Sequence, residues 1–218
     1  ASSASTCMYV LANNVTLDCK GFDINYSQSV SGYGVNNSGF NYSMIKSCNI
    51  VQADIASDNS NAYGVYIFKN SSNTVIYNNS ITTRGEGSDG VALFSEVYSN
   101  NISSNNIIIT TILVGGTYGV SLNSNAYNNN IYNNNITTVS TGSTTNHIGV
   151  FLSTNVYNNS VYSNTITMRG VAEWGVRLNT IAYYNNIYSN NITNAEGDGI
   201  ELSSTAYNNS VYRNNIIT

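Results

Sequence analysis

A repeated unit of 24 to 30 residues constrains this chain more than any other feature. Each unit opens with Gly, Val or Ile, any residue, and Leu or Ile, and six such openings follow one another at spacings of 26, 29, 30, 26 and 24 residues. A less regular unit starts at Gly34. A fixed period of this length indicates a solenoid, in which neighbouring repeats bury one continuous core. The openings start at Gly64, Gly90, Gly119, Gly149, Gly175 and Gly199.

Two more apolar positions recur inside each unit, and both lie in short stretches where apolar and polar residues alternate. This alternation predicts strands, and the apolar spacing of an amphipathic helix is not sustained anywhere. Each repeat therefore carries three short strands. The paired positions are Ile76 and Ile81, Ile102 and Ile107, Ile131 and Ile136, Val161 and Ile166, Ile187 and Ile192, and Val211 and Ile216.

Three strands per repeat predict an all-β, single-stranded, right-handed parallel β-helix of about eight coils. Proline is absent, as suits long stacks of paired strands. We expect a single β-helix domain over residues 1–218, with an irregular N-terminal coil over 1–33 and regular coils over 34–218. The repeats differ in length between the third strand and the next Gly, so insertions are expected at that corner.

Asn recurs at two corners of the repeat. Stacked Asn side chains tolerate left-handed backbone and bond the amide one coil away, so these positions predict structural ladders. One ladder comprises Asn79, Asn105, Asn134, Asn164, Asn190 and Asn214, and the other comprises Asn129, Asn159, Asn185 and Asn209.

Tyr recurs in two files. Tyrosines stacked at strand spacing support one another, and an exposed stripe of rings is also suited to binding sugars or a neighbouring rod. Both interpretations stay open. One file is Tyr98, Tyr127, Tyr157, Tyr183 and Tyr207, and the expected surface stripe is Tyr77, Tyr132, Tyr162, Tyr188 and Tyr212.

The segment "NNVTLDCKGFDI" (13–24), followed by the Gly-opened strands and Asn-x-Ile corners, resembles right-handed β-helix repeat proteins of archaeal and bacterial surfaces. These are similar to NosD-like and carbohydrate-binding β-helix (CASH) domains. The resemblance covers nearly the whole chain. It implies the fold, and it extends to polysaccharide lyases, periplasmic binding proteins and large surface proteins, so it leaves the activity open.

Charged residues make up only 8% of the chain, with a net charge of −4. The chain lacks the clustered Lys and Arg that bind nucleic acid, and no apolar run is long enough for a membrane span. Because ionisable residues are so few, we expect no catalytic residues and no enzymatic activity. His147, the one His, lies in the longest loop without an evident partner. No cofactor is expected; Ca²⁺ is the alternative, with Glu173, Glu196, Asp198 and Glu201 as candidate ligands near Arg177.

Cys19 and Cys48 fall at matching places in successive coils, which makes a disulfide between them plausible and leaves Cys7 over. Eleven Asn-x-Ser/Thr triplets are candidate N-glycosylation sites. By chance, forty Asn and fifty Ser or Thr in 218 residues yield about nine, so the excess is small. The triplets start at Asn14, Asn25, Asn36, Asn41, Asn70, Asn78, Asn101, Asn135, Asn158, Asn191 and Asn208.

Both ends of the predicted solenoid look uncapped. Open strand edges favour stacking onto other chains, with Met8, Val10, Val211 and Ile216 as the expected contact residues. Our leading hypothesis is an extracellular or cell-surface structural subunit that assembles head to tail into a filament or surface layer. The alternatives are a carbohydrate-binding or polysaccharide-cleaving β-helix protein, with glycans as partners, and an adhesive segment of a larger surface protein.

Overall fold

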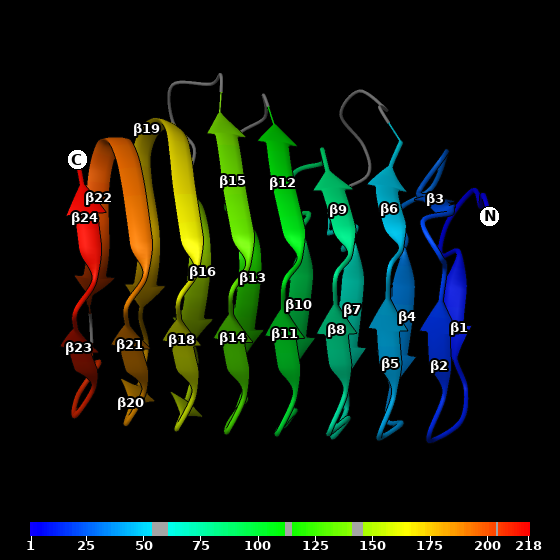
Figure 1. Cartoon of the computed structure of the whole chain (residues 1–218), viewed down its shortest axis with the longest axis horizontal. Coiled ribbons are helices and arrows are strands. Elements are labelled where there is room, and N and C mark those ends of the chain that lie inside the picture. The colour runs from blue at the N-terminus through cyan, green and yellow to red at the C-terminus, as the bar shows by residue number, and fades with distance from the viewer. Residues whose placement is uncertain (54–60, 112–114, 141–145, 204) are drawn as a thin grey trace.

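The computed structural model describes residues 1–53, 61–111, 115–140, 146–203 and 205–218. The described residues contain strands and turns, wound into a parallel β-helix whose coils lie side by side along the long axis (Figure 1). The N-terminus and C-terminus lie at opposite ends of this rod. The predicted fold class, an all-β solenoid with three strands per coil, is confirmed.

The first strand of each coil forms one side of the solenoid. Its members pair in parallel with a constant register, for example Val91 with Val120 and Leu93 with Leu122. These strands are β1 (Met8–Val10), β4 (Val35–Ser38), β7 (Val65–Phe68), β10 (Val91–Phe94), β13 (Thr117–Asn123) and β16 (His147–Ser153).

The second strand of each coil belongs to an eight-stranded sheet of its own. Every strand in it has three residues, and from β11 onward an Asn corner stands on both sides. The members are β2 (Thr16–Asp18), β5 (Met44–Lys46), β8 (Val75–Tyr77), β11 (Asn101–Ser103), β14 (Asn130–Tyr132), β18 (Ser160–Tyr162), β21 (Asn186–Tyr188) and β23 (Ser210–Tyr212).

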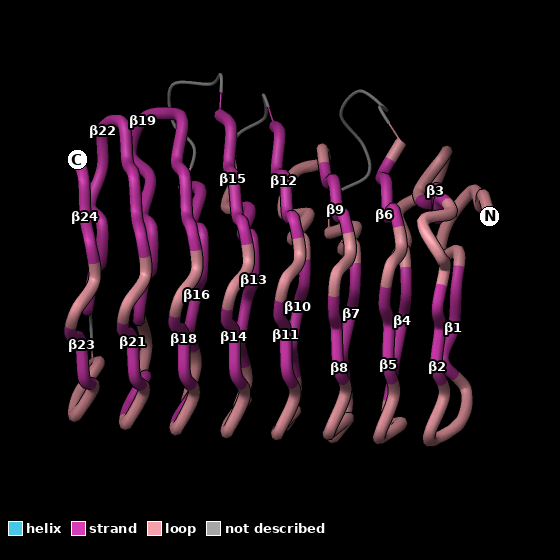
Figure 2. The backbone as a smooth tube through the Cα atoms, in the orientation of Figure 1, coloured by secondary structure: helices cyan, strands magenta, loops and turns pink. Residues whose placement is uncertain are grey.

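The third strand of each coil leads to the corner where repeat length varies. In the last coils the chain bends without a break, so that one long strand serves as the third strand of one coil and the first of the next (Figure 2). The strands are β3 (Asp23–Tyr26), β6 (Asn49–Gln52), β9 (Ser80–Thr83), β12 (Asn106–Thr111), β15 (Asn135–Ser140), β19 (Thr165–Leu178), β22 (Asn191–Leu202) and β24 (Asn215–Ile217); β17 (Val156–Tyr157) and β20 (Ala182–Tyr183) form a short corner pair.

The core consists of inward Ile, Val and Leu side chains stacked on their counterparts in adjacent coils. The Gly that opens each repeat is required by close packing. A Cβ at Gly119 would stand 2.3 Å from Ile136 Cγ2 and 2.5 Å from the carbonyl oxygen of Gly149. No larger residue fits between the first strand and the third strand at this point, which explains the repeated Gly-Val openings.

The two Asn ladders form as the sequence predicts. Asn105 donates its backbone N–H and an Nδ2–H to Asn134 Oδ1, both at 3.0 Å, and donates the second Nδ2–H to the Ile76 carbonyl at 2.9 Å. This pattern repeats at each step, and the ladder amides are buried in all but the last coil. The second ladder begins one coil earlier than predicted, at Asn100.

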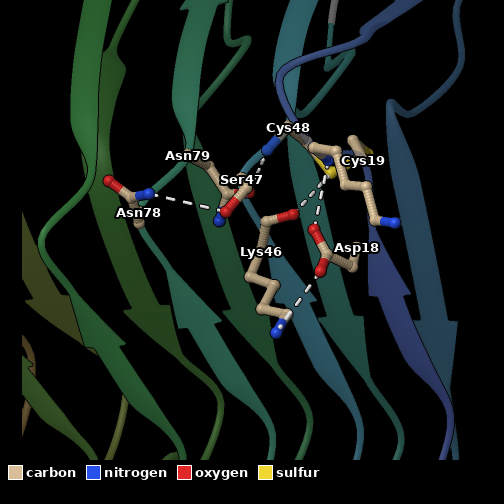
Figure 3. Close-up of polar contacts among 8 residues, drawn as sticks. Asp18, Cys19, Lys46, Ser47, Cys48, Asn78 and Asn79 are labelled. Atoms are coloured by element: carbon tan, nitrogen blue, oxygen red, sulfur yellow. Dashed lines mark hydrogen bonds and ion pairs between the residues drawn. A yellow bond between two sulfur atoms is a disulfide. The ribbon is translucent and has the colours of Figure 1, made fainter.

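The first two coils are joined differently (Figure 3). Cys19 and Cys48 form a disulfide, and Cys48 occupies the ladder position, where its N–H donates to Asn79 Oδ1 at 3.0 Å. Asp18 and Lys46 form an ion pair beside it at 3.4 Å. Cys7 is half-buried and unpaired.

The end residues differ in exposure. Val211 and Ile216 in the last coil are 41% and 43% exposed, whereas Val10 is buried and Met8 half-buried in the first. Stacking through the ends stays a prediction. Within the described residues, no helix is long and apolar enough to cross a membrane.

Glycosylation of the Asn-x-Ser/Thr triplets also stays a prediction. Seven of the eleven candidate Asn residues are exposed and four are half-buried. The exposed ones are Asn14, Asn70, Asn78, Asn135, Asn158, Asn191 and Asn208.

Candidate functional site

The expected Tyr stripe is a closed stack. Tyr132, Tyr162, Tyr188 and Tyr212 lie 4.9 to 5.1 Å apart between ring centroids, with interplanar angles of 2° to 4°. Each inner ring therefore covers the faces of its neighbours and presents only its edge and hydroxyl to solvent. Tyr77 does not join this stack, because Ser103 occupies the same position in the coil between Tyr77 and Tyr132.

The outward side chains of the first strands form a different aromatic surface, which we call the outer aromatic face. Here the residue type changes from coil to coil: Tyr66 is followed by Ala92, Ser121 and then Phe151 in the same row. The rings cannot stack in register, because small residues separate them. The face comprises Tyr33, Tyr63, Tyr66, Phe68, Phe94, Tyr118, Phe151 and Trp174, all half-buried.

Most ring pairs on the outer aromatic face are tilted. Tyr63 and Tyr66 meet at 48° with centroids 5.2 Å apart, and Tyr66 meets Phe94 at 65° and 6.0 Å. Tyr118 and Phe151 meet at 39° and 4.6 Å. Tilted rings leave parts of their faces uncovered, and ring faces are the part of an aromatic side chain that packs against the C–H groups of a flat ligand.

Asp89 lies under these rings, in the turn that leads into β10. Its Oδ1 accepts the backbone N–H of Tyr118 at 3.0 Å, and its Oδ2 accepts the hydroxyl of Ser121 at 2.5 Å. Burial raises the pKa of Asp89 to about 7, against the lowering effect of the hydrogen bonds from Ser121 and Tyr118. The carboxyl therefore exchanges its proton near neutral pH, as acid–base groups do.

The tyrosine hydroxyls around Asp89 remain protonated over the whole physiological range. Burial raises the pKa of Tyr63 and Tyr118, and the nearby Asp89 charge raises both further. Burial also raises the pKa of Tyr66 to about 12. The face thus offers neutral hydroxyl donors beside half-covered rings, a combination suited to ligands rich in hydroxyl groups.

The acidic residues named as Ca²⁺ candidates do not converge. Glu201 pairs with Arg177 at 2.7 Å, and Arg177 lies 4.4 Å above the Trp174 ring. Glu196 and Asp198 are exposed along β22. Within the described ranges no group of three or more His, Cys, Asp or Glu side chains has the arrangement of a metal site.

Glu173 and His147 lie inside the solenoid at the variable corner. Burial raises the pKa of Glu173 to about 7, and its carboxylate oxygens find no hydrogen-bond partner. The placement of His147 in a loop is wrong: it begins β16, is fully buried and contacts Thr117 through Nδ1. Burial lowers the pKa of His147 to about 4, against the raising effect of a backbone hydrogen bond with Thr117.

The sequence interpretation assigned no function to the outer aromatic face or to Asp89. A signal was present: inward positions of the first strand are uniform from repeat to repeat, whereas Tyr66, Ala92, Ser121, Phe151 and Arg177 vary at one outward position. A change of residue type at one position of an otherwise uniform repeat indicates that side chains at that position do not stack on identical neighbours.

Comparison with known proteins supports the fold. No protein-family model and no curated protein sequence matches the chain. Among solved structures, a double mutant of a periplasmic alginate epimerase matches with a TM-score of 0.52 at 14% identity, over 85% of this chain. The chain spans 48% of that protein, or about half its length.

Two further solved structures match more weakly. One is the enzymatically active domain of tailspike protein 2 of bacteriophage CBA120, with a TM-score of 0.30, 8% identity, and coverage of 98% of this chain and 42% of that one. The other is an alginate lyase from Paenibacillus, with a TM-score of 0.24, 11% identity, and coverage of 97% and 92%.

These comparisons correct one expectation. We expected a protein without enzymatic activity, but the solved structure that shares the fold is that of an epimerase. That expectation rested on the scarcity of charged residues. The outer aromatic face nevertheless holds the carboxyl of Asp89, whose pKa burial raises to about 7. The narrower resemblance to NosD-like and CASH domains is not shown.

Proposed function

We propose that the protein binds a polysaccharide chain across the outer aromatic face and acts on it. The observation that carries this proposal is the array of tilted, half-buried rings of Tyr63, Tyr66 and Phe94, with the buried carboxyl of Asp89 close enough to raise the pKa of Tyr63. Aromatic faces pack against the apolar faces of sugars, and phenol hydroxyls bond sugar hydroxyls. The fold shared with an alginate epimerase supports the same class of ligand.

The charges on this face favour a neutral polysaccharide over a polyuronate. Two cations lie on it: Lys69, which is 5.3 Å above the Phe68 ring, and Arg177, which is already paired with Glu201. The chain carries a net charge of −4. A polyuronate would bring one carboxylate per sugar and would find few partners for them.

Binding is tested by calorimetric titration with neutral glucans and mannans and, for comparison, alginate. Neutral chains should bind, and Tyr66→Ala should weaken binding about tenfold, because an exposed ring face is removed. Tyr162→Ala, in the closed stack, is the matched control and should bind as the unmodified protein does. Binding that survives Tyr66→Ala unchanged would contradict the proposed site.

Processing of the bound neutral chain is tested separately, by measuring new reducing ends. Asp89 is a carboxyl at this face with a pKa near neutral, so Asp89→Asn should abolish product formation while Tyr162→Phe leaves it unchanged. Product formation that is equal in the protein and its Asp89→Asn variant would remove Asp89 from the reaction.

A further inference from the structure

A surface groove lies at the corner that follows the first strands, beside the outer aromatic face: its lining residues Asn70 and Glu96 come two positions after Phe68 and Phe94. It encloses about 460 Å³ and runs over five coils. One wall carries rings of the Tyr file that runs from Tyr98 to Tyr207, and the other carries polar side chains from the turns that follow the first strands. The lining residues are Asn70, Glu96, Asn125, Tyr127, Asn155, Tyr157 and Tyr183.

The rings in this groove are evenly spaced. Tyr127 and Tyr157 have centroids 5.0 Å apart and Tyr157 and Tyr183 5.1 Å apart, with interplanar angles of 1° and 17°. The wall therefore offers a row of hydroxyl groups that recurs at the coil spacing. An extended, β-1,4-linked pyranose chain has sugars of similar length, so successive sugars would lie opposite successive rings.

The opposite wall offers amides and one carboxylate. The backbone N–H groups of Asn70, Glu96 and Asn125 are used by carbonyls of the next coil, at 2.9 to 3.1 Å. Asn155 donates its Nδ2–H to Asn125 Oδ1 at 2.5 Å. Among the described residues, the side chains of Asn70 and Glu96 have no protein partner and remain available to a ligand.

Glu96 is the charged member of a row of left-handed corner residues that also holds Asn70, Asn125, Asn155 and Ile181. Its exposed carboxylate lines the groove. A carboxylate accepts charge-assisted hydrogen bonds from two neighbouring sugar hydroxyls.

We propose that this corner groove is a second glycan-binding site, which holds a neutral polysaccharide chain along the solenoid axis with Glu96 accepting from a vicinal diol. The ligand class, a neutral polysaccharide, rests on the proposed function. The groove and its lining residues do not depend on it. A carboxylate at the centre of the groove also disfavours polyuronates, because like charges repel.

The experiment uses the full chain and NMR titration with cellohexaose and mannohexaose, and with oligomannuronate of equal length. Side-chain amide signals of Asn70 and Asn125 and ring signals of Tyr157 should shift with a neutral hexasaccharide. Glu96→Gln should weaken that binding about tenfold and Tyr157→Phe less, because the ring and its stacking are kept. Glu196→Gln and Tyr162→Phe are matched controls and should bind as the unmodified protein does.

The titration is repeated in Tyr66→Ala, which removes the outer aromatic face as a competing site. Groove signals that still shift in that variant support the second site, whatever the fate of the first. Shifts confined to Tyr66 and Tyr118 in the unmodified protein would overturn the second site and leave the proposed function standing. Equal affinity of Glu96→Gln and Glu196→Gln, or absence of groove shifts with all three sugars, would also overturn it.

Discussion

The corner ladders and the outer aromatic face are built on the same coils but obey opposite rules. In the ladders, one residue type recurs in every coil, and each side chain bonds or stacks on its copy. On the outer aromatic face, Tyr66, Ala92, Ser121 and Phe151 stand in one row, and the rings tilt.

This difference teaches where stability and function are located. A repeated side chain satisfies its own hydrogen bonds and covers its own ring faces, so little is left for a ligand. An irregular row leaves ring faces and hydroxyls unmatched, and it places Asp89 in surroundings that raise its pKa. Binding through ring faces therefore arises where the repeat is broken.

The largest expected effect is loss of a ladder amide. Asn134→Ala should lower the free energy of unfolding by about 4 kcal/mol, because it orphans the buried N–H groups of Asn105 and the Ile102 carbonyl. Urea denaturation measures this. The control is Asn135→Ala, which removes an exposed amide bonded to Asn106 and should cost under about 1 kcal/mol. Equal losses of unfolding free energy in the two variants would show that burial of the ladder amide adds nothing to stability.

Reduction of the disulfide comes next. It joins residues 29 positions apart, and its loss should lower the free energy of unfolding by about 3 kcal/mol. Thermal unfolding with and without reductant checks this, with a Cys19→Ser, Cys48→Ser double variant for comparison. The free Cys7→Ser variant should keep the full response to reductant; if it loses the response, Cys7 takes part in the bond.

The pH dependence of stability tests the outer aromatic face. The folded-state pKa of Asp89, about 7, lies above its ordinary value of 3.8. The stability it contributes is therefore fully present below pH 3.8 and lost as pH rises through 7. The protein should lose about 2 kcal/mol relative to Asp89→Asn between pH 5 and pH 7. His147 and Glu173 are common to both proteins and cancel; a constant difference across this range would contradict the raised pKa.

The smallest effect concerns the gap in the Tyr stripe. Ser103 separates Tyr77 from Tyr132, so Ser103→Tyr should complete the stack and stabilise the fold by about 1 kcal/mol. Urea denaturation measures the gain. A loss of stability would mean that rings cannot be added to this file freely.

The sequence alone predicts the fold well because every inward position repeats. Positions such as Ile131 and Ile136, the corner Asn134 and the opening Gly119 recur in each unit, and one coil predicts the next. The disulfide between Cys19 and Cys48 follows from the same alignment of coils.

The functional surface resists the same reasoning. Asp89 is buried, and that burial raises its pKa against hydrogen bonds from Ser121 and the Tyr118 backbone in the next coil. His147 follows a long insertion, so the sequence predicts a loop at this position. In the structure its backbone pairs with Thr117 and its ring is buried. These features are set by contacts between unlike residues in different coils, which a repeat pattern does not contain.

The central claim is tested most directly by measuring unfolding free energy and polysaccharide affinity for Tyr66→Ala and Tyr162→Ala side by side. The account predicts that Tyr66→Ala loses about tenfold in affinity for a neutral polysaccharide with little change in stability. Tyr162→Ala should lose about 1 kcal/mol or more of stability with its affinity unchanged. The opposite pairing, with affinity lost in Tyr162→Ala and retained in Tyr66→Ala, would contradict it.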